Sequence, residues 1–499
     1  MDLISNLALG FATSLSLYNL FYCFIGALFG TLIGVLPGLG PVATIAMLLP
    51  ITFGLEPVSA LIMLAGIYYG AQYGGSTTAI LINLPGESTS VVTALDGYQM
   101  ARQGKAGKAL ATAALGSFFA GTVTTIFIAL FAPPLANLAL QFGPPEYFAL
   151  MVLGLIASIT LASGSLIKAL AMILLGLLLG LVGRDVYTTE ARFTFDLENL
   201  SDGLQFVALA MGVYGIGEIV RNLETPEQRS VAVSKVGGLM LSKAEFLRIT
   251  PPVLRGTGLG AILGILPGGG ALLSSFASYA LEKKLSRNPA EFGRGAIEGV
   301  AGPESANNAG AQSSFIPMLT LGIPSNPVMA LMVGALVIHG ITPGPSFVTD
   351  KPDLFWGLVA SMWVGNLMLV VLNLPLIGIW VRLLTVPYNY LFPAIIVFSA
   401  IGVFSVNNST ADVLVMAGMG VFGYVLYKLN CEPAPLLLGF ILGPMLEENL
   451  RRSMLLFRGD ATQFLTRPLT ATLLGIALVS LIVVLLPNIS RKREVVFKE

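Results

Sequence analysis

Residues 30–40 read GTLIGVLPGLG, and residues 260–270 read GAILGILPGGG. Each stretch places two glycines four residues apart before the same Leu-Pro-Gly turn, and the two stretches lie 230 positions apart (260 − 30). A second landmark follows in the same order, because Gly70-Ala71-Gln72 recurs as Gly310-Ala311-Gln312. Two matched landmarks in one order indicate that the chain contains two duplicated halves.

The first turn ends a long apolar segment. The residues from Leu15 to Leu36 include no charged side chain, and roughly 20 apolar residues suffice for a helix to cross the hydrocarbon core of a membrane. Comparable segments follow along the whole chain, in which 11% of residues are charged and 55% hydrophobic, and the mean hydropathy is +0.82. We therefore predict an all-α, polytopic integral membrane protein with about 10–13 transmembrane or re-entrant helices in two repeated halves.

Composition excludes several other classes of protein. The formal net charge is zero, which offers no basic surface for nucleic acid. His339 is the only histidine, which argues against a multi-histidine metal site. Cys23 and Cys431 both lie in apolar surroundings, so the sequence predicts no disulfide framework.

Basic residues mark the expected boundaries of the halves. Residues 221–250 contain Arg221, Arg229, Lys235, Lys243 and Arg248, so the positive-inside rule predicts a cytoplasmic linker there. We expect a first transmembrane repeat at 1–220, a second repeat plus C-terminal helices at 251–488, and a cytoplasmic basic tail at 489–499. An odd number of crossings between the two Leu-Pro-Gly turns would make the repeats inverted, and inversion is what we expect.

Polar residues gather in one segment of each half. Residues 69–88 read YGAQYGGSTTAILINLPGES, and residues 304–327 read ESANNAGAQSSFIPMLTLGIPSNP. Both segments are too polar for a helix that faces lipid, and a broken helix is tolerated in a membrane only where its freed backbone is buried or lines a wet cavity. We therefore expect two re-entrant or discontinuous helices that meet near mid-membrane and form the transport site.

These two segments supply groups that can hold an anion without a fixed counter-charge. A helix that starts after Gly74 and Gly75 would present free N–H groups and hydroxyls to a carboxylate. The expected substrate-binding residues are Gly74, Gly75, Ser76, Thr77, Thr78, Asn307, Asn308, Gln312, Ser313, Ser314, Ser325 and Asn326. The alternative is that small and hydroxyl side chains at these positions only pack helices together.

Charged side chains at membrane depth are costly, and each is therefore a functional candidate. Asn83, Glu87 and Glu304 form the expected site for a coupling cation, either sodium or a proton, and we expect no other cofactor. Structural turns are expected at Pro37, Gly38, Pro85, Pro267, Gly268 and Pro324, because proline breaks the helical hydrogen-bond ladder.

Residues 70–88, the paired Leu-Pro-Gly turns and GVAGPESANNA at 299–309 together resemble the large membrane subunit of the tripartite tricarboxylate transporters, over essentially the whole chain. The resemblance implies a multi-pass permease of the bacterial inner membrane that imports tricarboxylates or related carboxylates by a cation gradient. It also implies two partners, a small four-helix membrane subunit and a periplasmic solute-binding protein. The sequence contains no Gly-x-x-x-x-Gly-Lys-Ser/Thr nucleotide loop, which agrees with transport that does not use ATP.

Two other functions compete with this interpretation. An uncoupled solute channel also uses broken helices, but matched repeats favour a transporter with alternating access. A hydrolase would need a nucleophile and a base, such as Ser346 and His339. No complete constellation accompanies these residues, so we expect no enzymatic activity.

Overall fold

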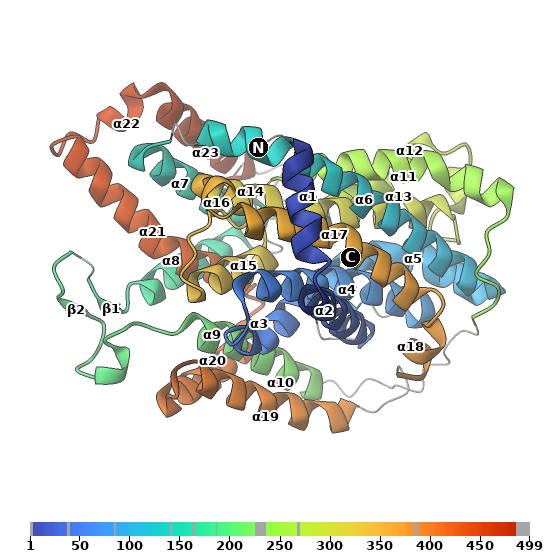
Figure 1. Ribbon diagram of the computed structural model, residues 1–499, viewed down its shortest axis with the longest axis horizontal. Helices are drawn as coiled ribbons and strands as arrows, with labels where there is room; N and C mark the ends of the chain where they lie inside the picture. The colour runs from blue at the N-terminus through green and yellow to red at the C-terminus, as the bar shows by residue number, and fades with distance from the viewer. Residues whose placement is uncertain are drawn as a thin grey trace.

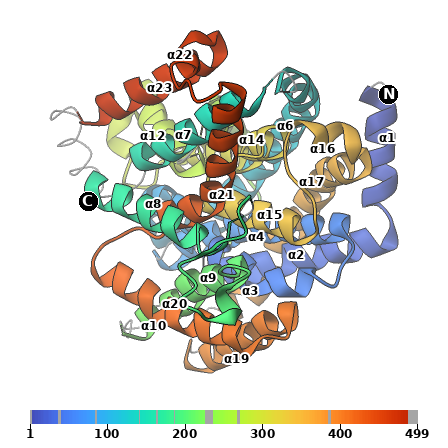
Figure 2. The same ribbon diagram turned by 90° about the vertical axis from the view of Figure 1, so that its left-hand side faces the viewer.

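The structure is a computed structural model that describes residues 3–36, 40–83, 86–139, 142–161, 165–185, 187–224, 236–266, 270–383 and 388–485. Within these residues the regular secondary structure is helical except for one short antiparallel ladder, formed by β1 (Gly183–Arg184) and β2 (Ala191–Arg192). Figures 1 and 2 show the helices packed into one body, and Figure 1 shows β1 and β2 projecting from it. The prediction of an all-α polytopic protein is confirmed.

Four helical runs are long and apolar enough to cross a membrane. They are α2 (Leu17–Val35), the run α5 (Val91–Met100), η2 (Ala101–Lys105) and α6 (Ala106–Ala139), then α17 (Pro352–Asn373) and α20 (Thr410–Lys428). Further apolar helices are α1 (Leu3–Ser14), α3 (Pro41–Thr52), α7 (Pro144–Leu161), α8 (Leu166–Gly180), α15 (Pro327–Ile338) and α23 (Pro468–Leu485). Their exposed leucines, isoleucines and phenylalanines provide the apolar outer surface that lipid requires.

The other elements complete the bundle. They are α9 (Phe206–Ala210), η4 (Met211–Ile216), α10 (Gly217–Glu224), α11 (Lys243–Leu263), α12 (Gly270–Leu285), α14 (Phe315–Leu321), α16 (Pro345–Asp350), α18 (Ile377–Leu383), α19 (Tyr388–Asn407), α21 (Ala434–Leu456) and α22 (Gln463–Thr466). Three short turns are η1 (Ser88–Ser90), η3 (Glu198–Leu200) and η5 (Pro289–Glu291).

Two helices form the centre of the molecule. Every residue from Ser59 to Ile82 of α4 (Pro57–Ile82) and from Gly299 to Ser313 of α13 (Glu298–Ser313) is buried. The second of these helices carries mostly polar and small residues, which could not face lipid. Burial on all sides means that their polar groups must find partners inside the protein.

The same helix pairing occurs in both halves. In the first half, a Cβ placed on Gly34 would lie 2.8 Å from the Ala71 Cα, so α2 and α4 touch backbone to backbone. In the second half, a Cβ on Gly264 would lie 2.6 Å from the Gly310 Cα, which brings α11 equally close to α13. Gly34 and Gly264 are the paired glycines of the two duplicated stretches, which favours the predicted duplication. Inversion of the repeats stays a prediction.

The first polar segment does not break where the sequence predicted. Gly74 and Gly75 lie inside the continuous helix α4, so no helix starts at Ser76. The hydroxyls of Ser76, Thr77 and Thr78 instead contact the carbonyl oxygens one turn earlier, at 3.0, 3.2 and 3.2 Å. The expected helix N-terminus at this point is therefore wrong. Tight packing of α4 on all sides favours helix here over the flexibility of two glycines.

The actual breaks follow and are equivalent in the two halves. The first helix ends at Asn83 and the corresponding helix α14 at Gly322, both in left-handed conformation with φ of 57° and 71°. The next elements have Glu87 and Asn326 as their N-caps. The two helix ends lie 239 positions apart (322 − 83), and so do the two N-caps (326 − 87). The break that follows the Gly-Ala-Gln landmark therefore occurs at equivalent positions in the two halves.

Candidate functional site

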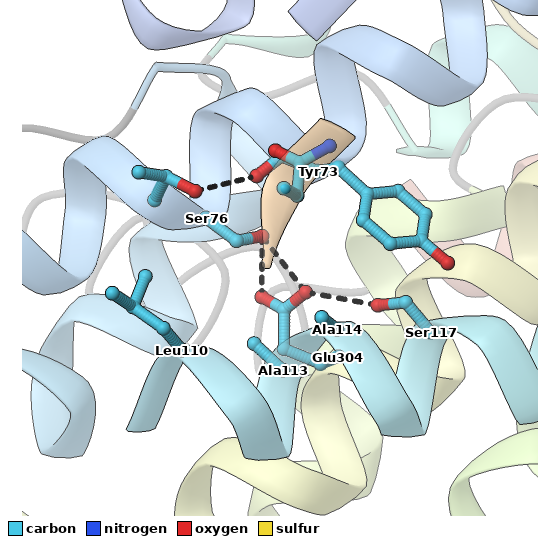
Figure 3. Close-up of a pocket in the computed structure, with 9 residues that line it drawn as sticks. Tyr73, Ser76, Leu110, Ala113, Ala114, Ser117 and Glu304 are labelled. Carbon is cyan, nitrogen blue, oxygen red and sulfur yellow. Dashed lines mark hydrogen bonds between the residues drawn. The ribbon is translucent and has the colours of Figure 1, made fainter. Parts of the chain in front are cut away.

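Glu304 is the centre of the candidate site. It lies on α13 with no exposed surface, and its carboxylate accepts hydrogen bonds from three hydroxyls on three other helices. The Ser76 Oγ on α4 lies 2.8 Å from each carboxylate oxygen, Thr93 on α5 contacts Oε1, and the Ser117 Oγ on α6 lies 3.4 Å from Oε2. Figure 3 shows the Glu304 carboxylate between Ser76 and Ser117. The site thus joins helices from both halves.

A pocket of about 250 Å³ opens beside this carboxylate. It is lined by Tyr73, Ser76, Thr77, Leu110, Ala113, Ala114, Ser117, Glu304 and Asn373 (Figure 3). Much of this volume is open to solvent, and the enclosed free space is about that of one water molecule, which is enough for an ion but not for a tricarboxylate. The polar groups of its lining supply mainly oxygen atoms.

A second buried carboxylate belongs to the same region. Glu87 is 8% exposed, interacts electrostatically with Glu304, and is contacted by the Thr89 hydroxyl. The Thr89 Oγ1 also lies 3.3 Å from the Gln72 Oε1. A Cβ added to Gly75 would lie 2.9 Å from the Glu87 Cγ, so this glycine makes room for the glutamate against α4. The hydrogen-bond partners described for both carboxylates are hydroxyls and amides.

Two amide side chains nearby have buried atoms without a hydrogen bond of good geometry. Asn307 and Gln312 are buried on α13, at 1% and 3% exposure. In the described part of the chain, neither the Asn307 Nδ2 nor its Oδ1 has a partner of good hydrogen-bond geometry, and the same holds for the Gln312 Oε1. The Asn307 amide nevertheless lies within hydrogen-bonding reach of the Glu87 carboxylate, although not in good geometry. Buried polar atoms are rarely left unpaired, so these atoms indicate a place for a ligand or an ion.

A sequence model described as the tripartite tricarboxylate transporter TctA family matches residues 20–438 of the chain. The chain belongs to this family. It is 64% identical over 499 residues, 100% of this chain and 99% of the relative, to an uncharacterized 52.8 kDa protein in the TAR-I ttuC' 3' region of Agrobacterium vitis. It is 65% identical over 240 residues, 48% of this chain and 99% of the relative, to an uncharacterized protein in the TAR-II ttuC' 3' region of the same organism. No solved structure matches.

Membership of the TctA family establishes transport across a membrane as the class of function. The family's tripartite organisation also implies two further components beside this chain. The matched residues contain both carboxylates, the Glu304 pocket and both helix breaks. The candidate site is therefore part of the region that defines the TctA family.

The predicted substrate residues fall into two groups in this TctA-family chain. Several donate hydrogen bonds to neighbouring protein groups. The Asn308 Nδ2 donates to the Ser117 Oγ at 2.6 Å and to the Glu304 carbonyl at 3.1 Å. The serine hydroxyls donate to backbone carbonyls: Ser313 to Gly260 and Gly310, Ser314 to Gly310 at 2.7 Å, and Ser325 to Ser314. The Asn326 Nδ2 donates to the Ser314 Oγ at 3.1 Å. Asn307 and Gln312 retain unpaired atoms, and only Ser76 and Thr77 of the predicted residues line the pocket together with Glu304.

The remaining predicted positions lie elsewhere. Asn83 is exposed where α4 ends, whereas Glu87 and Glu304 are buried. Pro324 is buried within the second break. Pro37, Gly38, Pro85, Pro267 and Gly268 lie outside the described residues.

Several site residues were missed by the sequence analysis. Thr93, Ser117 and Asn373 reach the site from α5, α6 and α17, outside the two polar segments that the sequence singled out. Asn366 and Asn373 lie seven residues apart on α17, and the Tyr73 hydroxyl donates to the Asn366 Oδ1 at 2.7 Å. Two asparagines at helical spacing in an apolar run are a signal that could have identified this helix.

The residues considered for other chemistry are not brought together. The His339 Nε2 has no hydrogen-bond partner in the described part of the chain, and Ser346 is exposed on α16, so the two do not form a nucleophile–base pair. The described residues also contain no group of three or more His, Cys, Asp or Glu side chains that could hold a metal ion.

Proposed function

We propose that this TctA-family chain is the large permease subunit of a binding-protein-dependent secondary transporter that imports tricarboxylates or related carboxylates. A sodium or proton gradient drives the import. The observation that carries the proposal is the pair of buried carboxylates, Glu87 and Glu304, whose described hydrogen-bond partners are uncharged. A charge at this depth costs a few kcal/mol unless it is compensated, so it is retained where it serves a function.

The cation is the partner that these carboxylates lack. Sodium prefers oxygen ligands, and the Glu304 pocket offers carboxylate, hydroxyl and amide oxygens. The Asn373 Oδ1, which belongs to a pocket-lining residue, has no hydrogen-bond partner in the described part of the chain. A proton on one of the two carboxylates would relieve the same excess of negative charge. Either cation would reduce the negative charge of the buried pair and so weaken its repulsion of an anionic substrate.

The unpaired amides supply the groups for that anion. Asn307 can donate from its Nδ2 to a substrate carboxylate, and it lies on the same helix as Glu304 and beside Glu87. A bound cation beside Glu87 and Glu304 would attract the substrate, and an occupied anion site would in turn favour the cation. Such mutual stabilisation is a coupling free energy between two sites.

The two breaks are placed so that each touches the other half. Glu87, at the first break, interacts with Asn307 on α13, and Asn326, at the second break, interacts with Tyr68 on α4. Each contact therefore joins the break of one half to the central buried helix of the other half. We infer that a movement of one half against the other changes both contacts together, as alternating access requires.

The test is uptake of labelled citrate and other small carboxylates into proteoliposomes. The vesicles hold this chain with its small membrane subunit, and the solute-binding protein is added outside under an imposed sodium or proton gradient. Accumulation that needs both the binding protein and one gradient supports the proposal and identifies the cation. Flux that merely equilibrates the solute, with either gradient or none, supports the uncoupled channel instead.

A further inference from the structure

One segment projects from the bundle and shows apolar side chains. We call residues 183–185 and 187–204, which include β1, β2 and η3, the hairpin segment. Figure 1 shows its strands at the left end of the molecule, beyond the neighbouring helices. Tyr187, Phe193, Phe195 and Leu197 are exposed, and Phe195 is 80% exposed. Large exposed aromatic side chains on a protruding segment are characteristic of surfaces that bind a partner.

The hairpin segment is firmly attached to the body. Asp185 is 4% exposed and accepts the backbone N–H groups of Tyr187 and Thr188 at 2.8 and 2.9 Å. Its carboxylate also contacts the guanidinium groups of Arg192 and of Arg451, the latter on α21 at 2.8 Å. The Arg192 guanidinium continues to Glu447 on the same helix at 3.0 Å. The exposed aromatics are thus presented by a pre-organised support.

The backbone beneath the aromatics is held in an unfavourable conformation. Phe193, Phe195 and Asp196 have φ angles of 53°, 51° and 59°. Left-handed backbone is costly for residues other than glycine, and it persists where the surrounding structure requires it, often at functional sites. Both phenylalanines remain exposed in this conformation, so burial of their side chains does not compensate for the backbone strain.

Many of the described basic residues lie at the opposite end of the molecule. There the kink at η2 contacts the loop after η5, because the Gln103 Nε2 donates to the Arg294 carbonyl at 2.7 Å. The start of α6, directly after this kink, lies against the segment before α11, since a Cβ on Gly107 would lie 2.6 Å from the Gly238 carbonyl oxygen. Lysines and arginines of this end are Arg102, Lys105, Lys108, Lys243, Arg248, Lys283, Lys284, Arg287 and Arg294. By the positive-inside rule, this end faces the cytoplasm.

The hairpin segment and the basic end lie far apart. The start of α11 lies at the right in Figure 1 and the hairpin strands at the left. Because the positive-inside rule assigns the basic end to the cytoplasm, we place the hairpin segment on the opposite, extracytoplasmic face.

Charge distinguishes between a membrane and a protein as the partner. The exposed charged residues of the hairpin segment are Glu190, Asp196, Glu198 and Asp202 against Arg184, so the segment itself is acidic around Phe193 and Phe195. Arg451 and Arg452 of α21 lie beside Tyr187 at its base. Anionic lipid headgroups repel such a surface and attract basic ones. A protein with a basic contact patch is attracted to it and would bury the aromatic side chains at the centre of the contact.

We propose that the hairpin segment is the docking surface for a soluble extracytoplasmic protein with a basic contact patch. The proposal rests on the proposed function, in which a solute-binding protein delivers the substrate at this face. Phe193 and Phe195 are the central contacts, and the acidic residues around them attract and orient the partner.

The experiment measures docking in the complete transporter. The probe is the solute-binding protein that supports uptake by the wild-type proteoliposomes, and the readout is its half-saturating concentration. The double variant Asp196→Lys/Glu198→Lys and the variant Phe195→Ser are compared with Lys284→Glu, an exposed charge reversal at the opposite end. We expect the half-saturating concentration to rise roughly tenfold in both hairpin variants, with an unchanged maximal rate and an unchanged value in the control.

The other outcomes each contradict the proposal. Unchanged half-saturation in both hairpin variants, at normal membrane abundance, excludes docking at this surface. A change that depends on the anionic lipid content of the vesicles assigns the surface to the membrane, and a change in oligomeric state assigns it to a second copy of the chain. If wild-type uptake needs no binding protein, the proposed function itself is contradicted, because no such partner then delivers the substrate. This result differs from one in which uptake needs the binding protein but the hairpin variants leave its half-saturating concentration unchanged.

Discussion

The Ser76 Oγ on α4 lies 2.8 Å from both carboxylate oxygens of Glu304 on α13, and 3.0 Å from the carbonyl oxygen of Gln72. A serine hydroxyl carries one proton, so it can satisfy one of these three acceptors at a time. Thr93 and Ser117 also donate to this carboxylate, but all three described donors are neutral hydroxyls and leave its negative charge without a cationic partner. A proton or a cation at this position would neutralise that charge, which is why we place the coupling cation here.

Removal of the Ser76 hydroxyl should weaken cation binding. We expect Ser76→Ala to raise the half-saturating concentration of the coupling cation roughly tenfold, because groups that support an ion's ligands typically contribute that much. Ser117→Ala should act less, since its Oγ lies 3.4 Å from the carboxylate. The measurement is initial uptake rate against cation concentration. Thr124→Val is the control, because Thr124 is buried with no hydrogen-bond partner for its hydroxyl in the described residues; equal effects in all three variants would contradict the assignment.

The neighbouring asparagines of α13 should have different roles. Asn307 has unpaired amide atoms, whereas the Asn308 amide bonds to Ser117 and to the Glu304 backbone. Asn307→Ala is therefore expected to raise the KM for the carboxylate roughly tenfold to a hundredfold with little loss of thermal stability, since a charged hydrogen bond contributes about 1.5–3 kcal/mol. Asn308→Ala should mainly lower the Tm. Substrate titrations and melting curves of both variants test this, and a reversed pattern would place the substrate elsewhere.

The glycine contact between α11 and α13 should control stability. A Cβ on Gly260 would lie 2.8 Å from the Ala309 Cβ, so Gly260→Ala forces the helices apart and should cost about 1–3 kcal/mol. The helix-propensity gain of about 1 kcal/mol for Ala over Gly does not offset this. Gly475→Ala on α23 is the matched control, with nothing within 4 Å of the added Cβ, and should be neutral or stabilising. Thermal melting in detergent distinguishes the two, and equal Tm values would show that the contact is loose.

The start of α11 should respond to acid. The Lys108 ammonium, 2.6 Å from Glu245, and the Ser242 backbone and hydroxyl hold the pKa of Glu245 at about 2, below its ordinary value of 4.5. A lowered pKa in the folded state contributes stability above pH 4.5, and this stability is lost as the pH falls towards 2. Glu245→Gln should therefore lower the Tm at pH 7, by a small amount because the pair is partly exposed. The difference from wild type should shrink below pH 4.5, and a difference that is constant across pH would contradict the assignment.

The sequence predicted the parts of this fold that local patterns determine. Apolar length indicated the membrane helices, and the repeated Leu-Pro-Gly stretches marked the glycines that pack α2 on α4 and α11 on α13. The polar segments were identified because their residues cannot face lipid. Glu87 and Glu304 stood out for the same reason, as charged residues beside these segments.

The sequence failed where packing between distant elements decides. Gly74 and Gly75 suggested a break, yet α4 continues through them because it is enclosed on all sides. Thr93 and Ser117 reach Glu304 only through the arrangement of α5, α6 and α13. On an apolar helix a single hydroxyl that binds an ion looks the same as one that bonds to its own backbone, so local sequence does not separate the two.

The most direct test of the account is gradient-driven accumulation of labelled citrate, or of whichever carboxylate the wild type transports, in proteoliposomes of the complete transporter with Glu304→Gln. We predict that the variant reaches normal membrane abundance and still responds to the solute-binding protein, but loses accumulation under the sodium or proton gradient that drives the wild type. Accumulation and cation dependence equal to those of the wild type would show that Glu304 takes no part in coupling.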